Sequence, residues 1–121
     1  MGTNYYAIPK LVKKEKEILI KAIEDENYGL AYQMIPEKIH IGKSSAGWQF
    51  IFDHQNWEHF KKEKKSVEDF LGRCKIIDEY GRTVTTDEFW EMIEAKSKYK
   101  HDGEYSDKID GLWFSRGTDF C

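Results

Sequence analysis

The sequence has few of the residues that cross-link a chain or hold a metal. Its 121 residues include only two cysteines and two prolines. Cys74 and Cys121 cannot build a disulfide framework, and the sequence has no Cys-x-x-Cys pair of the kind found in structural zinc sites. We therefore expect no disulfide, no metal, no cofactor, and a reducing cytoplasmic location.

Long apolar runs and an excess of basic charge are also missing. No apolar stretch approaches the ~20 residues of a membrane-spanning helix, and we expect no signal peptide at the N-terminus. Lys and Arg number 19 against 22 Asp and Glu, a net charge of −3. Because proteins that bind duplexes carry a basic face, this balance argues against nonspecific nucleic-acid binding. Neither a membrane nor nonspecific nucleic acid is therefore an expected partner.

What the chain does have is charge and aromatic area. Charged residues make up 34% of it and aromatic residues 15%. The length is typical of one domain, so we interpret residues 1–121 as a single domain with a small core. A core of that size cannot bury every aromatic ring. One or two exposed rings could therefore stack on a base or anchor a protein partner.

The hydrophobic pattern changes period several times along the chain, from strand-like to helical and back. Residues 11–26 have helical periodicity, with apolar side chains along one stripe, but lysines stand at the start of this helix and acids at its end. That order opposes the helix macrodipole, so we expect the packed apolar stripe to hold the helix. The other expected elements are a strand at 3–8, a short helix at 30–35, a hairpin at 38–53 with its loop at 42–47, and a helix from Trp57 capped by Asn56.

The second half of the chain is predicted from capping and turn signals. Ser66 with Asp69, and Thr85 with Glu88, have the spacing of capping boxes for two helices. The other expected elements are a hairpin of 74–78 with 82–85, an exposed polar loop at 97–107, and a last strand at 111–115. The prediction is therefore an α+β single small domain, with a short, mostly antiparallel β-sheet of two hairpins and about three helices packed on it.

The loop at 42–47 is the segment most suggestive of a ligand site. Two glycines permit close backbone approach, and successive N–H groups in such a loop can form a nest for an anion. It is not a Walker A loop, because Glu37 stands where that motif needs glycine. A plain hairpin turn is the competing interpretation. The candidate ligand-binding residues are His40, Gly42, Lys43, Ser44, Ser45, Gly47, Trp48, Tyr80 and Arg82.

An acid–base site is the weaker alternative. His40, Asp78 and Glu79 could supply a general base or acid for a nuclease or phosphodiesterase. Acidic residues near hairpins, however, more often form turns. His54 and His59 have the wrong spacing for one helix face. We therefore assign no catalytic residue and expect that the protein is not an enzyme.

Three blocks resemble a family of small bacteriophage-encoded proteins. They are the stretches MGTNYY at the N-terminus, HIGKSSAGW from His40 to Trp48, and IDEYGR ending at Arg82. Many members of that family have a cysteine-rich stretch between the first two blocks, and this sequence has the charged helix there instead. The resemblance implies a phage source, a role outside the virion and a location in the host cytoplasm.

Small phage accessory proteins commonly disarm a host system, so the resemblance favours two functions. The first is a non-catalytic binder that inhibits a host protein in counter-defence or host takeover. The alternative is a sponge that sequesters a nucleotide signal or another phosphate-bearing ligand with the loop at 42–47. Such a sponge would need a homo-oligomer, because one small domain cannot enclose a ligand. The binder would use the polar loop at 97–107.

Overall fold

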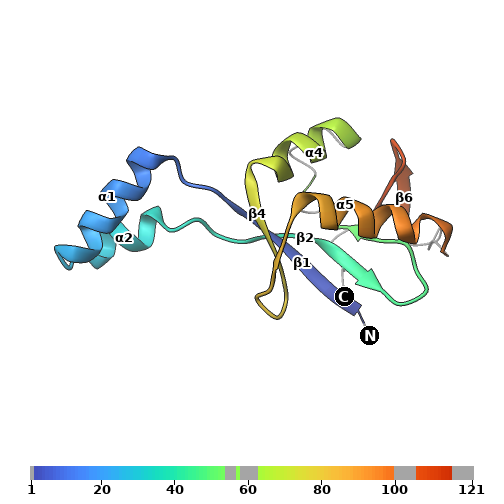
Figure 1. The fold of residues 1–121 in the computed structure, drawn as a ribbon, viewed down its shortest axis with the longest axis horizontal. Coiled ribbons are helices and arrows are strands. Elements are labelled where there is room, and N and C mark those ends of the chain that lie inside the picture. The colour runs from blue at the N-terminus through green and yellow to red at the C-terminus, as the bar shows by residue number, and fades with distance from the viewer. Residues whose placement is uncertain (1, 54–56, 58–62, 100–105, 116–121) are drawn as a thin grey trace.

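The protein is an α+β domain, as its pattern predicts, but the sheet is larger than two hairpins. The computed structural model describes residues 2–53, 57, 63–99 and 106–115. In that part of the chain one mixed sheet of seven strands accompanies the helices (Figure 1). No helix within it is long and apolar enough to cross a membrane.

The strand order in the sheet is β5-β4-β1-β2-β3-β7-β6. All neighbouring strands are antiparallel except β3 and β7, which run parallel. The strands are β1 (Gly2–Pro9), β2 (Ile39–Ser45), β3 (Ile51–Phe52), β4 (Cys74–Asp78), β5 (Thr83–Val84), β6 (Ser106–Ile109) and β7 (Leu112–Ser115). The first strand of the sequence is thus flanked by β2 on one side and β4 on the other.

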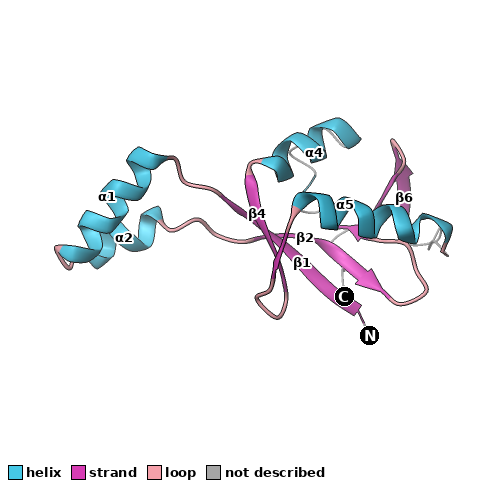
Figure 2. Ribbon diagram, viewed as in Figure 1, coloured by secondary structure: helices cyan, strands magenta, loops and turns pink. Residues whose placement is uncertain are grey.

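The helices fall into two groups with different surroundings (Figure 2). Helices α4 (Lys64–Gly72) and α5 (Thr86–Ala95), the latter followed by the short 3₁₀ helix η1 (Lys96–Lys98), lie together over the sheet. Helices α1 (Lys13–Glu24) and α2 (Tyr28–Met34) lie well to one side of it. Helices α1 and α2 are therefore not among the helices that cover the sheet.

The hydrophobic core lies between the sheet and the pair α4 and α5. Phe89 of α5 is fully buried, and its ring contacts Phe50 in edge-to-face geometry with centroids 5.3 Å apart. Such aromatic pairs add stabilisation beyond the area they bury. The buried cluster consists of Ala7, Ile41, Phe50, Phe52, Trp57, Val67, Leu71, Cys74, Ile76, Phe89, Leu112 and Phe114. Neither α1 nor α2 contributes a residue to this cluster.

Several local predictions are confirmed. Thr85 caps α5: its hydroxyl accepts a hydrogen bond from the Glu88 N–H at 3.1 Å, and the Glu88 carboxylate accepts one from the Thr85 N–H. The hairpin of β4 and β5 forms, with Gly81 at a φ of 83° in its turn. Local capping and turn chemistry decided these elements, which is why sequence alone predicts them.

Other local predictions are wrong. Ser66 lies inside α4, which begins at Lys64 after the N-cap Glu63, so it caps nothing. Ser106 is buried and begins β6, so the predicted exposed loop at 97–107 ends early. Residues 100–105 of that segment, and the predicted cap Asn56, lie outside the described residues.

The predicted loop at 42–47 is also wrong, because β2 continues to Ser45. Ser45 pairs with Gly2 of β1, and Lys43 pairs with both Asn4 of β1 and Ile51 of β3. The hydrogen-bonding partners offered by two neighbouring strands therefore extend β2 through a segment whose glycine and serines suggest a loop.

Candidate functional site: a projecting helical hairpin

Helices α1 and α2 form a helical hairpin inserted between two adjacent strands of the sheet. Ala7 of β1 and Ile39 of β2 are paired in the ladder. The chain between them leaves the sheet, forms both helices and returns (Figure 1). The two connections are extended, with Val12 at ψ 163° and Ile35 at ψ 122°. The hairpin therefore projects from the body of the protein on two extended connecting segments.

The hairpin is held by a tight turn and by the packing of its two helices against each other. Glu26 has a φ of 57°, and the Asn27 N–H donates a hydrogen bond to the Ala22 carbonyl at 2.8 Å. Asn27 then caps α2, its side chain accepting from the Leu30 N–H at 3.4 Å. Ala22 and Ala31 are the buried residues of α1 and α2. Two small side chains let the helices approach closely but bury little apolar area.

Most large apolar side chains of the hairpin face solvent. The described part of the chain has 11 exposed large hydrophobic residues, and eight of them belong to this segment. They are Val12, Ile18, Ile20, Ile23, Tyr28, Leu30, Tyr32 and Ile35. The expectation that a packed apolar stripe holds the first helix is therefore wrong. A cluster of exposed apolar side chains on a projecting element is a mark of a protein-binding surface.

The exposed side chains of α2 and its C-cap are arranged in a stripe. Tyr28, Tyr32 and Ile35 are spaced i, i+4 and i+7, which places them on one side of the helix. Their exposed fractions are 64%, 82% and 54%. We call these three residues the α2 stripe. Tyrosine combines a large apolar ring with a hydroxyl that hydrogen-bonds, which makes it common at protein interfaces.

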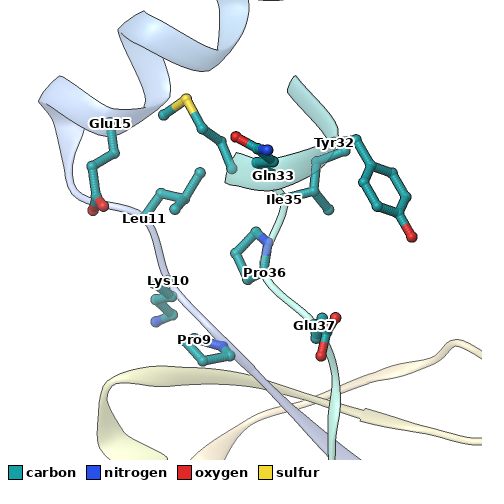
Figure 3. A pocket seen from close by; sticks show the side chains of 10 residues that line it. Pro9, Lys10, Leu11, Glu15, Tyr32, Gln33, Ile35, Pro36 and Glu37 are labelled. Carbon is teal, nitrogen blue, oxygen red and sulfur yellow. The ribbon is translucent and has the colours of Figure 1, made fainter. Parts of the chain in front are cut away.

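A cavity of about 650 Å³ opens beside the α2 stripe, at the base of the hairpin. Figure 3 shows Leu11 of the first connection and Pro36 of the second on its opposite sides, with Tyr32 and Ile35 at one flank. Glu15 lies at the other flank, where its carboxylate accepts a hydrogen bond from the Val12 N–H at 3.1 Å. The full lining is Pro9, Lys10, Leu11, Glu15, Tyr32, Gln33, Met34, Ile35, Pro36 and Glu37. The hairpin thus offers a depression of mixed apolar and polar lining beside the α2 stripe.

The residues expected to form an anion nest do not form one. Gly42, Ser44 and Ser45 lie in β2, and Gly47, with a φ of 79°, is in the turn that follows. The Trp48 side chain is exposed, with 41% of the residue accessible, and the backbone N–H of Trp48 donates to the Ser45 carbonyl at 3.2 Å. Because three of these residues are part of a strand, successive N–H groups do not converge on one point as a nest requires.

The turn after β2 is fixed to the end of α5. The Lys96 ammonium donates to the Ser45 carbonyl at 2.8 Å, and burial lowers the pKa of Lys96. The Gln49 amide donates to the carbonyls of Ser97 and Tyr99 at 2.9 and 3.0 Å. These contacts give the polar residues of this turn a structural role.

His40 joins strands of the sheet. Its Nδ1 lies 2.7 Å from an Asp53 carboxylate oxygen and its Nε2 lies 2.8 Å from the Asn4 side-chain oxygen. Its ring also packs against Tyr6, with centroids 5.4 Å apart. With both ring nitrogens already hydrogen-bonded, His40 is held as a structural side chain between β1 and the residue after β3.

The remaining candidate residues lie in or beside the turn between β4 and β5. The Asp78 carboxylate accepts from the N–H groups of Tyr80 and Arg82 at 2.9 and 3.0 Å, and the Arg82 guanidinium lies 3.5 Å from the same carboxylate. Glu79 reaches across to β1, where it accepts from the Asn4 N–H at 2.8 Å. The acids of this turn therefore organise its backbone.

The sheet brings some of these candidates together and keeps others apart. Lys43 pairs with Asn4, whose N–H binds Glu79, so the end of β2 and the β4–β5 turn share one end of the sheet. His40 pairs with Tyr6, whereas Asp78 pairs with Tyr5. Neighbouring residues of a strand point to opposite faces. The acid–base set of His40, Asp78 and Glu79 is therefore divided between the two faces of the sheet.

Two further titratable groups among the described residues have pKa values shifted by burial. Burial raises the pKa of the Cys74 thiol, so the thiolate that a nucleophile needs is disfavoured. Burial also raises the pKa of Tyr5. Within the described residues, no three His, Cys, Asp or Glu side chains gather closely enough to hold a metal ion.

Sequence reasoning missed the α2 stripe. It assigned residues 11–26 to a packed helix and did not weigh Tyr28, Tyr32 or Ile35 as functional residues. Their i, i+4, i+7 spacing was a usable signal, since it places two tyrosines of a short helix and the isoleucine of its C-cap on one side.

The fold and this surface define a small α+β protein whose most exposed apolar surface is a helical hairpin set apart from the core. Comparisons with protein families, with curated proteins and with solved structures found no match to this chain.

Proposed function

We propose that the protein is a non-catalytic binder that inhibits a host protein during phage infection, and that the α1–α2 hairpin makes the contact. The observation that carries the binding part is the concentration of exposed apolar side chains on the hairpin. The phage and host part depends on the resemblance of three sequence blocks. The two parts are independent, and the binding part can be tested without the other.

The α2 stripe and the adjacent cavity suit a partner that presents apolar side chains. Tyr28 and Tyr32 would supply the large rings that dominate binding energy at interfaces, and Ile35 extends them toward the cavity. A tyrosine at the centre of an interface typically contributes ~2 kcal/mol or more, about a 30-fold change in affinity.

The two alternatives have weaker support. The nucleotide sponge depended on a loop at 42–47, and that segment is mostly strand. An acidic side chain, Glu79, also stands at the end of the sheet where phosphate would have to bind. The nuclease or phosphodiesterase depended on His40, Asp78 and Glu79 acting together, and these lie on different faces. Both stay hypotheses: a ligand-binding assay tests the sponge, and a turnover assay tests the nuclease or phosphodiesterase.

The test compares two sets of substitutions at exposed aromatic or apolar positions. The first replaces the α2 stripe: Tyr28→Ser, Tyr32→Ser and Ile35→Ser together. The matched control replaces Trp48→Ser and Tyr80→Ser, which are 41% and 70% exposed but lie outside the hairpin. Each protein is purified from host lysate and its native and denatured masses are compared by mass spectrometry.

We expect a host polypeptide in a near-stoichiometric complex with the wild type and the control, and at least a tenfold loss of it with the stripe variant. A complex that survives the stripe variant and fails in the control would overturn the assignment of the hairpin. A bound mass of a few hundred daltons, released on denaturation, would favour the sponge. A clean unbound mass would contradict stable host binding.

A further inference from the structure

The order of charges along α1 opposes the macrodipole of an isolated helix. Lys13, Lys14 and Lys16 lie in its first turn, and Glu24 to Glu26 close it. Cations near an N-terminus and anions near a C-terminus oppose the macrodipole. Glu15 and Lys21 offset part of this, and Lys21 pairs with Asp25 at 3.0 Å. The remaining charges require an explanation outside the isolated helix.

Lys13, Lys16 and Glu24 lie on a face of α1 that α2 does not cover. Ala22 marks the side that contacts α2, and successive residues of a helix are about 100° apart, so Ile20 points away from it. Ile20 and Ile23 are 55% and 50% exposed. Their neighbours on this side are Lys13, Lys16, Glu17 and Glu24. We call these six residues the outer face of α1.

The outer face has an apolar centre, a net basic end with Lys13, Lys16 and Glu17, and an acidic end with Glu24. Lys16 and Glu24 stand four residues before and four residues after Ile20. Within the described chain neither Lys13, Lys16 nor Glu24 forms an ion pair. A second α1 laid antiparallel across the first, with Ile20 against Ile20, would place each Lys16 beside the Glu24 of the other copy.

We propose that the protein forms an antiparallel two-fold dimer through the outer face of α1. The occupant of the face is a second copy of this chain, because the face is complementary to itself: basic end meets acidic end twice, and apolar centre meets apolar centre. A two-fold axis requires this self-complementarity. The same antiparallel arrangement also opposes the two helix dipoles, which favours the pairing.

The dimer is concentration-dependent rather than obligate. Helix α1 has 12 residues, so the shared length is about 18 Å. Two helices of that length bury less than the ~800 Å² per partner of a typical stable interface. The proposal goes beyond host binding, which uses the α2 stripe. The two surfaces share no residue, so either can fail alone.

A charge swap within one chain tests the geometry. Lys16→Glu sets two carboxylates against each other at both ends of the dimer. Lys16→Glu with Glu24→Lys restores both pairs in reversed sense. The rescue cannot come from within one helix, since residues 16 and 24 are eight apart, roughly 12 Å along the axis. Lys14→Glu is the matched control: it makes the same charge change on the opposite side of α1.

Sedimentation equilibrium from ~10 to ~500 µM protein measures the dissociation constant of the dimer. We expect the wild type to dimerise in this range, Lys16→Glu to weaken the dimer about tenfold, and the double swap to return it to within about threefold. Lys14→Glu should change it by less than about twofold, and Ile20→Glu should abolish it. A wild type that stays monomeric, a double swap without rescue, or equal effects of Lys14→Glu and Lys16→Glu would each overturn the proposal.

A cross-link gives a second readout that does not depend on affinity. In a Cys121→Ser background, Ile20→Cys should form a disulfide-linked dimer under mild oxidation, because the two-fold axis brings the two thiols together. Lys14→Cys, on the opposite side of α1, should not. Cys74 is buried and stays reduced. Equal cross-linking at both positions would contradict the antiparallel arrangement, as would cross-linking at position 14 alone.

Discussion

Replacing Gly42 by alanine should destabilise the fold substantially. A Cβ at this position would overlap the Ile51 carbonyl oxygen and lie 2.7 and 2.9 Å from two ring carbons of Phe50, where ordinary contacts are 3.4 to 4 Å. The ring cannot move aside easily, since it packs against Phe52 and Phe89 with centroids 4.9 and 5.3 Å away. The backbone cannot retreat without loosening the short pairing of β2 with β3.

Overpacking of a well-packed core costs ~1–3 kcal/mol, and two rigid neighbours place Gly42→Ala toward the upper end. We expect a loss of about 2–3 kcal/mol in the free energy of unfolding, with a drop in Tm of roughly 6–12 °C. Urea unfolding followed by the summed fluorescence of the four tryptophans, of which Trp57 is buried, measures it.

Gly29→Ala is the matched control. Gly29 lies within α2 and has no other atom within 4 Å of the added Cβ. The same chemical change should there stabilise the helix by about 0.5–1 kcal/mol. The close approach at Gly42 would be refuted if Gly42→Ala unfolded within ~0.5 kcal/mol of the wild type. Such a result would also reopen the interpretation of 42–47 as an open loop.

Four further predictions concern the cap of α5, the acid that completes it, a buried pair and a buried thiol. Thr85→Ala removes the cap of α5 and should lower the free energy of unfolding by ~1 kcal/mol, measured by urea titration. The Thr85 hydrogen bonds lower the pKa of Glu88. The contribution of the Glu88 carboxylate to folding stability is therefore present above the ordinary carboxyl pKa and is lost as pH falls through the lowered pKa. The Tm values of wild type and Glu88→Gln should converge in acid. Asp53→Ala removes the hydrogen bond between the Asp53 carboxylate and Nδ1 of the half-buried His40, and should cost ~1–3 kcal/mol in the same titration. Burial raises the pKa of the Cys74 thiol above its ordinary value of 9.0. The contribution of the thiol to folding stability is therefore present below 9.0 and is lost as pH rises through the raised pKa. Cys74→Ala should make the fall of Tm at alkaline pH less steep.

Elements fixed by local chemistry could be predicted from the sequence. The cap at Thr85 and the turn at Gly81 each depend on residues within four positions of one another. The strand at 74–78 and the last strand also follow from short alternating patterns. These features need no knowledge of the rest of the chain.

Elements fixed by distant partners could not be predicted in this way. The continuation of β2 through Ser45 depends on pairing with Gly2, which is 43 residues away in the sequence. The structural role of His40 depends on Asn4 and Asp53, which reach it from different parts of the chain. A single sequence shows the polar residue but not the partner that satisfies it, so these residues were predicted as ligand-binding.

The helical hairpin combines both cases. Its helices were predicted approximately, because a 3.6-residue pattern is local. Its position was not, because a pattern of apolar residues shows which side of a helix is apolar but not whether anything covers it. The inference that the apolar stripe of 11–26 packs on a core assumed that every amphipathic helix near a sheet lies on it.

The separation of the hairpin from the core makes its surfaces accessible to clean tests. The body draws its buried cluster from the sheet, α4, α5 and Trp57, so substitutions at Tyr32 or Ile20 remove no core contact. Loss of binding in such variants would therefore report on contact rather than on folding. The same separation lets selection vary the hairpin without endangering the fold, since its exposed residues carry little of the folding free energy. Under the two proposals, the tyrosine stripe of α2 would contact a partner and the charge pattern of α1 a second copy, and variants of each surface test one contact without disturbing the other.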